Sequence, residues 1–182
     1  MGTKDRIASD LERSFAEAGF AEQGVEALRA GADVSLRTLY KHFPSREAMI
    51  VGALQHRDAA YARWLEGGPE TGAAHVLYPL VRLGDWLAEV ANTGCLFLNA
   101  WAQYPDSEAI AAVVKDHKAR LADGFSARLA CVAPGRDTGH LAETLFLLHE
   151  GMTQAARLQG REIAYEAAMH AARAALAAAE ID

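Results

Sequence analysis

The residues whose types and spacing could do chemistry gather in positions 35–46 of this 182-residue chain. The segment reads Ser-Leu-Arg-Thr-Leu-Tyr-Lys-His-Phe-Pro-Ser-Arg and contains no acidic side chain. An arginine can donate two hydrogen bonds to a guanine edge, whereas lysine and hydroxyl groups bind phosphate oxygens. We therefore expect this segment to contact a nucleic acid if one helix presents its polar side chains together.

The spacing of the apolar residues predicts a helix over 36–43. Leu39 and Phe43 lie four residues apart and would face inward, which leaves the basic side chains on the outer face. Ser35 stands directly before this helix, where an N-cap residue is preferred. The segment thus has the features of a short helix that displays its polar face.

The elements around it predict a helix-turn-helix. A first helix is expected over 4–18, a second over 24–32, and a turn at Asp33-Val34 leads to the helix at 36–43. Ser45 can cap a long fourth helix over 46–65, and Glu66-Gly-Gly-Pro69 interrupts the chain after it. Further helices are expected over 73–92, 95–104, 107–132, 137–159 and 163–180.

Composition supports an all-α globular protein of about nine helices. The chain has 39 alanines, and its apolar residues recur every three or four positions without sustained alternation. Its two cysteines, Cys95 and Cys131, exclude a disulfide scaffold, and no spacing of cysteine and histidine predicts a metal site or a cofactor. No apolar run is long enough to cross a membrane, and no apolar signal region follows the N-terminus, so we expect a cytoplasmic protein.

The negative charge is confined to the later part of the chain. Residues 1–64 hold 9 basic and 9 acidic side chains, whereas residues 65–182 hold 9 basic and 15 acidic ones, giving the net charge of −6. A local basic segment on an acidic body suits one specific phosphate surface and disfavours non-specific ones.

Two stretches of the sequence resemble the TetR family of transcriptional regulators. Residues 34–48 read Val-Ser-Leu-Arg-Thr-Leu-Tyr-Lys-His-Phe-Pro-Ser-Arg-Glu-Ala, similar to the family's V-S-x-x-T-L-Y-x-x-F-x-S-K-E-A. Residues 15–20 read Phe-Ala-Glu-Ala-Gly-Phe, similar to F-x-x-x-G-[FY]. The resemblance covers about residues 3–50. It implies a DNA-binding domain over 1–50 and a C-terminal ligand-binding and dimerisation domain over 51–182.

The resemblance also assigns roles to residues of the recognition segment. It implies that Thr38, Tyr40 and Arg46 contact phosphates, and that Leu36 and Arg37 lie where bases are read. The predicted DNA-binding residues are Ser35, Leu36, Arg37, Thr38, Tyr40, Lys41, His42 and Arg46.

Three positions depart from the family's pattern. Asp33 replaces the turn glycine, and the threonine that usually begins the second helix is replaced by Gly24 or Gln23. Arg29 occupies a position that usually holds a small alanine. Asp33 can adopt a left-handed backbone at modest cost, whereas Arg29 requires different local packing.

Large aromatic residues of the later helices are candidates for a ligand pocket. Phe97 and Trp101 lie four apart beside Asn99, which suits a small, largely apolar ligand held by few polar groups. The predicted ligand-binding residues are Trp64, Trp86, Phe97, Asn99, Trp101, Tyr104, Phe125, Phe146 and His149. The alternative for each is an ordinary core position.

The last two helices predict a homodimer. The helix over 137–159 is apolar over so wide an arc that it should bury two faces, and the final helix is rich in alanine, which permits close helix packing. The predicted interface residues are Leu141, Leu145, Leu148, Met152, Ala168 and Ala172. The alternative is the internal core of a monomer.

Taken with these features, the resemblance implies a repressor that binds a palindromic DNA operator as a homodimer and is released by a small, largely apolar effector. No phosphate-binding loop or nucleophile motif indicates an enzyme. Two other hypotheses remain at this point. One is a ligand-binding or protein-interaction module that has lost DNA binding, and the other is an all-helical enzyme that uses the C-terminal pocket.

Overall fold

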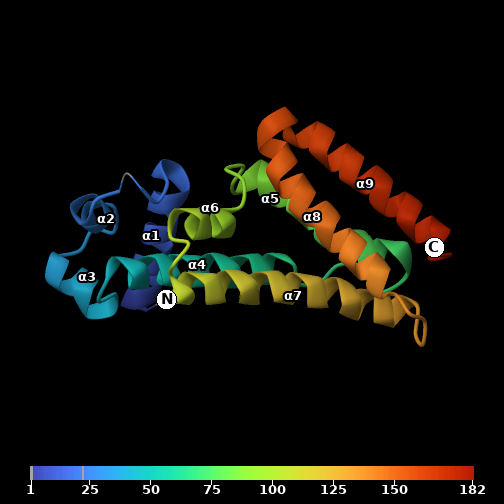
Figure 1. The fold of residues 1–182 in the computed structure, drawn as a ribbon, viewed down its shortest axis with the longest axis horizontal. Helices are drawn as coiled ribbons and strands as arrows, with labels where there is room; N and C mark the ends of the chain where they lie inside the picture. The colour runs from blue at the N-terminus through green and yellow to red at the C-terminus, as the bar shows by residue number, and fades with distance from the viewer. Residues whose placement is uncertain (1, 22) are drawn as a thin grey trace. The chain divides into compact units, whose positions relative to one another are not determined.

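Nine α-helices make up the described part of the chain, residues 2–21 and 23–182 of a computed structural model (Figure 1). No β-strand occurs in these residues, which confirms the all-α prediction. Each helix begins and ends within three residues of its expected bounds. The helices are α1 (Thr3–Ala18), α2 (Val25–Gly31), α3 (Leu36–His42), α4 (Arg46–Trp64), α5 (Gly72–Glu89), α6 (Leu96–Gln103), α7 (Glu108–Val132), α8 (Gly139–Gln159) and α9 (Arg161–Ala178).

The helix ends near the recognition segment follow local signals in the sequence. Gly19 has a φ of 76°, and its N–H donates to the Phe15 carbonyl at 2.9 Å, which closes α1. At the start of α4 the Ser45 hydroxyl accepts the Ala48 N–H at 3.0 Å. Because these bonds satisfy backbone groups that a helix end leaves unpaired, α1 ends and α4 begins as predicted.

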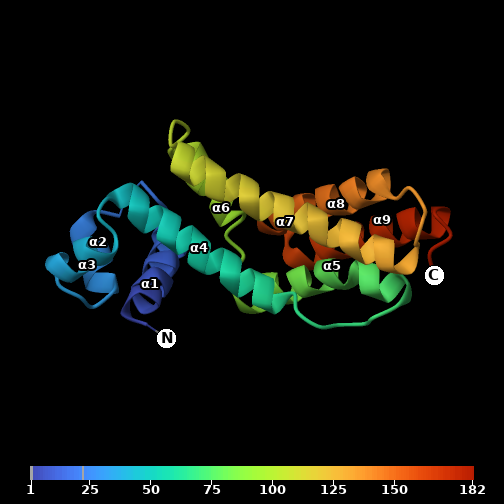
Figure 2. The same ribbon diagram turned by 90° about the horizontal axis from the view of Figure 1, so that it is seen from below.

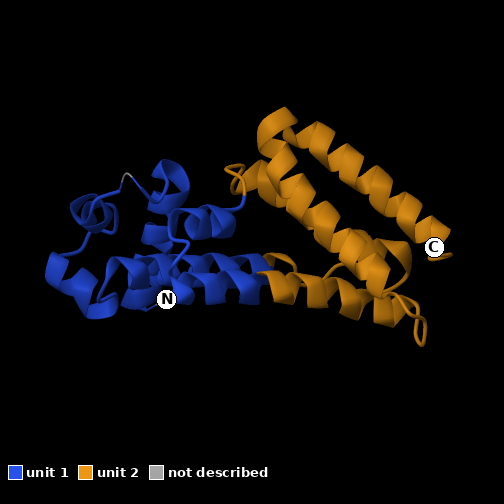
Figure 3. Cartoon of the chain, viewed as in Figure 1, with its two compact units in different colours: residues 1–63, 95–117 blue, residues 64–94, 118–182 orange. Residues whose placement is uncertain are grey.

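The chain divides into two compact units, coloured separately in Figure 3. Unit 1 comprises residues 1–63 and 95–117, and unit 2 comprises residues 64–94 and 118–182. In unit 1 the first three helices share one apolar core, to which Ile7, Leu11, Phe15, Leu28 and Leu39 contribute. This core holds α3 from its inner side.

Unit 1 extends beyond the expected DNA-binding domain of residues 1–50. Leu54 of α4, Phe97 of α6, and Ile110 and Val114 of α7 are buried in the same core as the first three helices. The compact unit therefore differs from the division expected at residue 50, because apolar faces far along the chain cover the helix-turn-helix.

Unit 2 is built on α5, α8, α9 and residues 118–132 of α7. Helices α8 and α9 fold back on each other at Gly160, whose φ is 95°, and α5 packs against both (Figure 2). Their core includes Leu80 of α5, Phe125 of α7, Leu145 of α8 and Leu176 of α9.

Neither a membrane span nor a metal site is found in the described residues. None of the described helices combines the length and the apolar character needed to span a bilayer. Residues 2–21 and 23–182 contain no group of three side chains placed to ligate a metal ion.

Candidate nucleic-acid interface

The N-terminus of α3 is fixed by a cap between two predicted DNA-binding residues. The Ser35 hydroxyl accepts the Thr38 N–H at 3.1 Å, and the two hydroxyl oxygens lie 2.9 Å apart. One hydroxyl hydrogen satisfies the bond between them, so the other hydroxyl hydrogen is available to a phosphate oxygen. The cap therefore orients both side chains at the exposed start of α3.

The outer face of α3 carries the remaining polar candidates. Leu39 is fully buried and Phe43 is 2% exposed, so the inner face faces the unit 1 core as predicted. On the outer face Arg37 and Lys41 are exposed, Tyr40 is 43% exposed and Leu36 is 36% exposed. His42 and Thr38 are half-buried at the sides of the helix. The outer face thus combines two cations, one phenol and one apolar side chain.

The turn before α3 accommodates the departures from the family's pattern. Asp33 has a φ of 48°, which is the left-handed conformation expected where a glycine is usual. The Arg29 guanidinium donates one hydrogen bond to the Val34 carbonyl at 3.3 Å and another to the Glu26 carboxylate at 2.9 Å. Arg29 therefore joins α2 to the turn.

Arg46 does not join the exposed face of α3. Its guanidinium donates to the carbonyls of Phe20 and Gln23 and, through Nε, to the Tyr104 hydroxyl at 2.8 Å. It also lies 5.8 Å from the centre of the Phe15 ring. The structure therefore places Arg46 in contacts within unit 1, in contrast to the phosphate contact implied by the sequence resemblance.

Comparisons with known proteins agree with this geometry. Residues 9–53 match the family model for bacterial regulatory proteins of the tetR family. The chain is 27% identical over 128 residues to the HTH-type transcriptional regulator UidR of Escherichia coli strain K12, and the match covers 70% of this chain and 64% of UidR. A TetR-family transcriptional regulator from Streptomyces coelicolor superposes with a TM-score of 0.86 and 26% identity, over 96% of this chain and 94% of that one. Residues 9–53 therefore form an N-terminal domain of the tetR-family type.

A further solved structure shares the TetR-family fold. The TetR family transcriptional regulator CifR, a cysteine mutant solved with 26-base-pair operator DNA, gives a TM-score of 0.74 at 22% identity, over 93% of this chain and 95% of CifR. UidR and the Streptomyces coelicolor protein are both transcriptional regulators. This chain spans about two thirds of the length of the curated relative UidR.

The nine predicted ligand-binding residues of this chain divide between the two units. Unit 1 contains Phe97, Asn99, Trp101 and Tyr104, all on α6 or at its end. Phe97 is buried and stacks on His117 at 3.7 Å, Asn99 is exposed, and the Tyr104 hydroxyl accepts from Arg46. Phe97 and Tyr104 therefore have a packing role and a hydrogen-bonding role within unit 1.

The other five predicted ligand-binding residues lie in unit 2 and include two ring pairs. The rings of Trp64 and Trp86 meet edge to face with centres 5.5 Å apart, and those of Phe125 and His149 do so at 6.2 Å. Phe146 is half-buried against the unit 2 core.

His149 is a deeply buried titratable group of unit 2. Burial lowers the pKa of its imidazole, so the ring is neutral near pH 7. Burial alone would raise the pKa of neighbouring Glu150, but hydrogen bonds from His149 and Lys118 and the positive charge of Lys118 lower it to about 2. Lys118 Nζ lies 2.7 Å from Glu150, while His149 Nδ1 lies 3.5 Å from the carboxylate. Lys118 is therefore the closer partner of the ionised carboxylate.

Most of the predicted dimer residues are buried within unit 2 itself. Leu145, Met152, Ala168 and Ala172 are each at most 5% exposed, and Leu141 and Leu148 pack against the unit 2 core. The sequence prediction thus selected the inner faces of α8 and α9. Six of the exposed small and apolar residues of the two helices form what we call the outer face of α8 and α9: Leu147, Gly151, Leu158, Ile163, Ala167 and Ala174.

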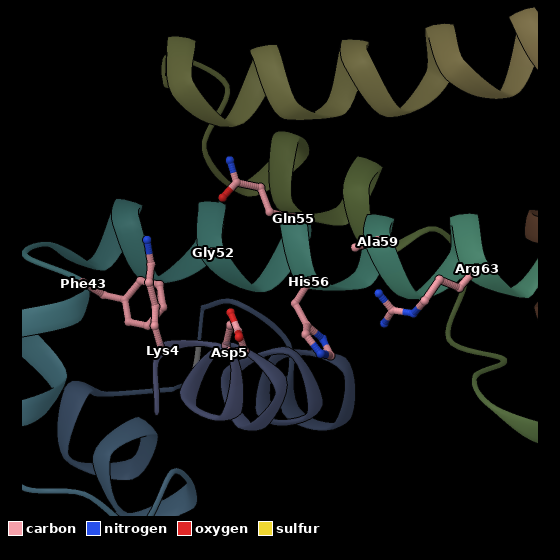
Figure 4. A pocket seen from close by; sticks show the side chains of 9 residues that line it. Lys4, Asp5, Phe43, Gly52, Gln55, His56, Ala59 and Arg63 are labelled. Atoms are coloured by element: carbon pink, nitrogen blue, oxygen red, sulfur yellow. The ribbon is translucent and has the colours of Figure 1, made fainter. Parts of the chain in front are cut away.

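A pocket of about 390 Å³ lies between α1 and α4 in unit 1 (Figure 4). Lys4 and Asp5 of α1 border it together with Phe43, while His56 and Arg63 border it from α4. None of the nine predicted ligand-binding residues lines this pocket. Its border of charged side chains does not fit the apolar ligand expected from the sequence.

Proposed function

We propose that this chain is a transcriptional regulator whose residues 1–50 bind duplex DNA through α3. The observation that carries the proposal is the outer face of α3, where Arg37, Tyr40 and Lys41 project from a capped helix anchored by Leu39. A helix of this kind, preceded by α2 and a tight turn, fits the major groove of DNA. CifR, which shares the fold, was solved with operator DNA.

Each outer-face residue has a proposed role. Arg37 in the first turn of α3 reads a guanine edge through two N–H donors, and Leu36 contacts an apolar base edge such as a thymine methyl. Thr38, Tyr40 and Lys41 bind phosphate oxygens and set the register of the helix on the duplex. Arg46 is left out of this set because its guanidinium donates to protein acceptors.

The proposed regulator acts as a homodimer on a palindromic operator in the cytoplasm. The outer face of α8 and α9 supports this proposal, because Leu147 is 60% exposed, Leu158 is 86% exposed and Ile163 is 58% exposed. Two copies related by a two-fold axis would bury these side chains and place two α3 helices at fixed spacing.

The proposed effector is a small, largely apolar molecule bound by unit 2, and its binding relieves repression. The ring pairs around Trp64 and Phe125 provide apolar surface, and the neutral His149 provides one polar group without a charge. Release follows from linkage: the effector prefers a conformation with low operator affinity, so DNA weakens effector binding by the same factor.

The proposal is tested by offering the purified chain a random duplex library and sequencing the retained DNA. A palindromic site whose affinity falls steeply with salt concentration supports a dimeric DNA-binding protein. On that site Arg37→Ala should cost about 1–3 kcal/mol of binding free energy and reduce base selectivity. Arg63→Ala is the matched control, since this exposed arginine lies 17 residues along α4 from Arg46, about 25 Å away.

A different outcome would favour one of the other hypotheses. A folded dimer that retains no duplex, with or without candidate effectors, would contradict the proposal and favour an interaction module. Chemical turnover of a bound molecule would favour an enzyme.

A further inference from the structure

A short corner between α6 and α7 contacts the start of α4. Tyr104 ends α6, and its hydroxyl accepts from Arg46 Nε at 2.8 Å. Three residues later Ser107 directly precedes α7, where its hydroxyl accepts the Ile110 N–H at 3.2 Å and donates to the Glu47 carboxylate at 2.5 Å. The bonds to Arg46 and Glu47 lie in unit 1, and both reach the first turn of α4, directly after the connection from α3.

Arg46 extends this contact to the segment between α1 and α2. Its two terminal nitrogens donate to the carbonyls of Phe20 and Gln23. One side chain therefore joins three parts of unit 1 that are far apart in the sequence: the end of α6, the start of α4 and the approach to α2. We call this set of hydrogen bonds around Arg46 the junction. Hydrogen bonds from a charged guanidinium are stronger than those between neutral groups, so these bonds strongly restrain the three segments that they join.

The junction contacts the chain both before and after the recognition helix α3. α2 precedes α3 and begins just after Gln23, and α4 follows α3 and begins at Arg46. Leu28 of α2 and Phe43 at the end of α3 are buried in the same core as Met49 and Ile50 of α4, so a shift at Arg46 would act on the helices that flank α3. The Tyr104 hydroxyl therefore contacts a side chain that touches the segments on both sides of α3.

We propose that Arg46 and Tyr104 are positioning residues for operator recognition, which hold α3 at the angle that DNA requires and do not touch DNA. This inference rests on the proposed DNA-binding function. It gives Arg46 a different role from the phosphate contact that its place in the sequence pattern implies.

The test compares Tyr104→Phe and Arg46→Gln with the wild type on the selected duplex, at a temperature where all variants are fully folded. Tyr104→Phe removes one oxygen atom and no charge. Tyr78→Phe is the matched control, because the Tyr78 hydroxyl also takes part in one hydrogen bond, to the Glu66 carbonyl at 3.2 Å, within unit 2. The measured quantities are the operator affinity and its dependence on salt concentration.

A positioning role predicts that Tyr104→Phe weakens operator binding by about 5-fold or more, within the usual range of couplings between sites, with an unchanged salt slope. Arg46→Gln should weaken binding at least as much, again with an unchanged slope. The double variant should bind no more weakly than Arg46→Gln alone, because both changes break one junction. Tyr78→Phe should bind as the wild type does.

Three results would overturn the inference. A salt slope that is shallower by about 0.9 in Arg46→Gln would identify a direct phosphate contact. Wild-type affinity in Tyr104→Phe, even with a lowered melting temperature, would mean that the bond only stabilises the fold. If Arg46→Gln does not fold, hydrogen exchange of the α2 and α3 amides in Tyr104→Phe still decides the test. The inference predicts faster exchange of these amides in Tyr104→Phe and unchanged exchange in Tyr78→Phe. Unchanged exchange in Tyr104→Phe is the third result that would overturn the inference. A wild type that binds no duplex would instead refute the proposed function itself.

Discussion

Gly52→Ala is expected to destabilise unit 1, although alanine is the better helix former. Gly52 is buried in α4, and the Phe43 ring packs directly on its Cα. A Cβ at this position would lie 3.0 Å from Cδ1 and 3.2 Å from Cζ of that ring, and closer still to Cε1. Real Cβ atoms essentially never come so close to a neighbour, so the ring has to move.

Two opposing effects set the size of the change. Replacing a helical glycine by alanine stabilises a helix by about 0.8–1 kcal/mol. Overpacking a filled core costs about 1–3 kcal/mol, and the upper part of that range applies because Phe43 is a rigid ring that is only 2% exposed. Phe43 borders the pocket between α1 and α4, so a ring displaced into that pocket would gain contact with water (Figure 4). The expected net loss is therefore about 1–2 kcal/mol.

The assay is urea unfolding followed by helical circular dichroism, with hydrogen exchange to assign the change to α3 and α4. Gly124→Ala is the control, because a Cβ added to Gly124 in α7 would have no neighbouring atom within 4 Å. This control should gain about 0.5–1 kcal/mol. If Gly52→Ala is stabilised as much as Gly124→Ala, the packing argument for Phe43 and the anchoring of α3 is wrong.

Three further predictions address the turn, the outer face and the buried histidine. Asp33→Gly should be more stable than Asp33→Ala by about 1 kcal/mol in urea unfolding, because φ is 48° there; equal stabilities would contradict this. Leu158→Glu should dissociate the dimer in analytical ultracentrifugation, whereas Val90→Glu, at a residue 48% exposed at the end of α5, should leave it intact; a dimer that survives the first change would refute the proposed face. Because the pKa of His149 is lowered in the folded chain, the unfolded chain binds a proton at this imidazole first as pH falls below about 6.5. The free energy of unfolding therefore falls as the pH falls from 7 to 5, and His149→Gln should reduce this decrease. Parallel stability curves for the two proteins would contradict it. Glu150 does not interfere, since its contribution is lost only between about pH 4.5 and 2.

The helices were predictable from the sequence because their signals are local. Gly19 ends α1, Ser45 caps α4, and the four-residue spacing of Leu39 and Phe43 sets the inner face of α3. Each of these features depends on side chains within one or two turns of the chain. The left-handed backbone of Asp33 was predictable for the same reason, because it depends only on the φ angle of that one residue.

Periodicity did not predict which partner covers a helix face. Leu145 and Met152 lie on one apolar stripe of α8, and the sequence pattern assigned that stripe to a second subunit. In the structure Leu145 is fully buried in the unit 2 core and Met152 is 2% exposed. A stripe shows which residues lie together, but a helix of the same chain and a helix of another copy bury it equally well. The more exposed Leu158 and Ile163 carried a weaker pattern and were not predicted.

Arg37 and Arg46 illustrate the same limit for charged residues. They lie nine positions apart in one basic segment, and both were predicted to contact DNA. Arg46 lies beside the carbonyls of Phe20 and Gln23, which follow the end of α1 and belong to no helix. Carbonyls at such a position need a donor when water is excluded, and a guanidinium can satisfy several of them at once. Phe20 itself is 4% exposed. The difference between the two arginines therefore arises from the acceptors that folding brings to Arg46 and from the Tyr104 hydroxyl 58 residues away. Arg37 is exposed on the outer face of α3, where we propose that it donates to DNA.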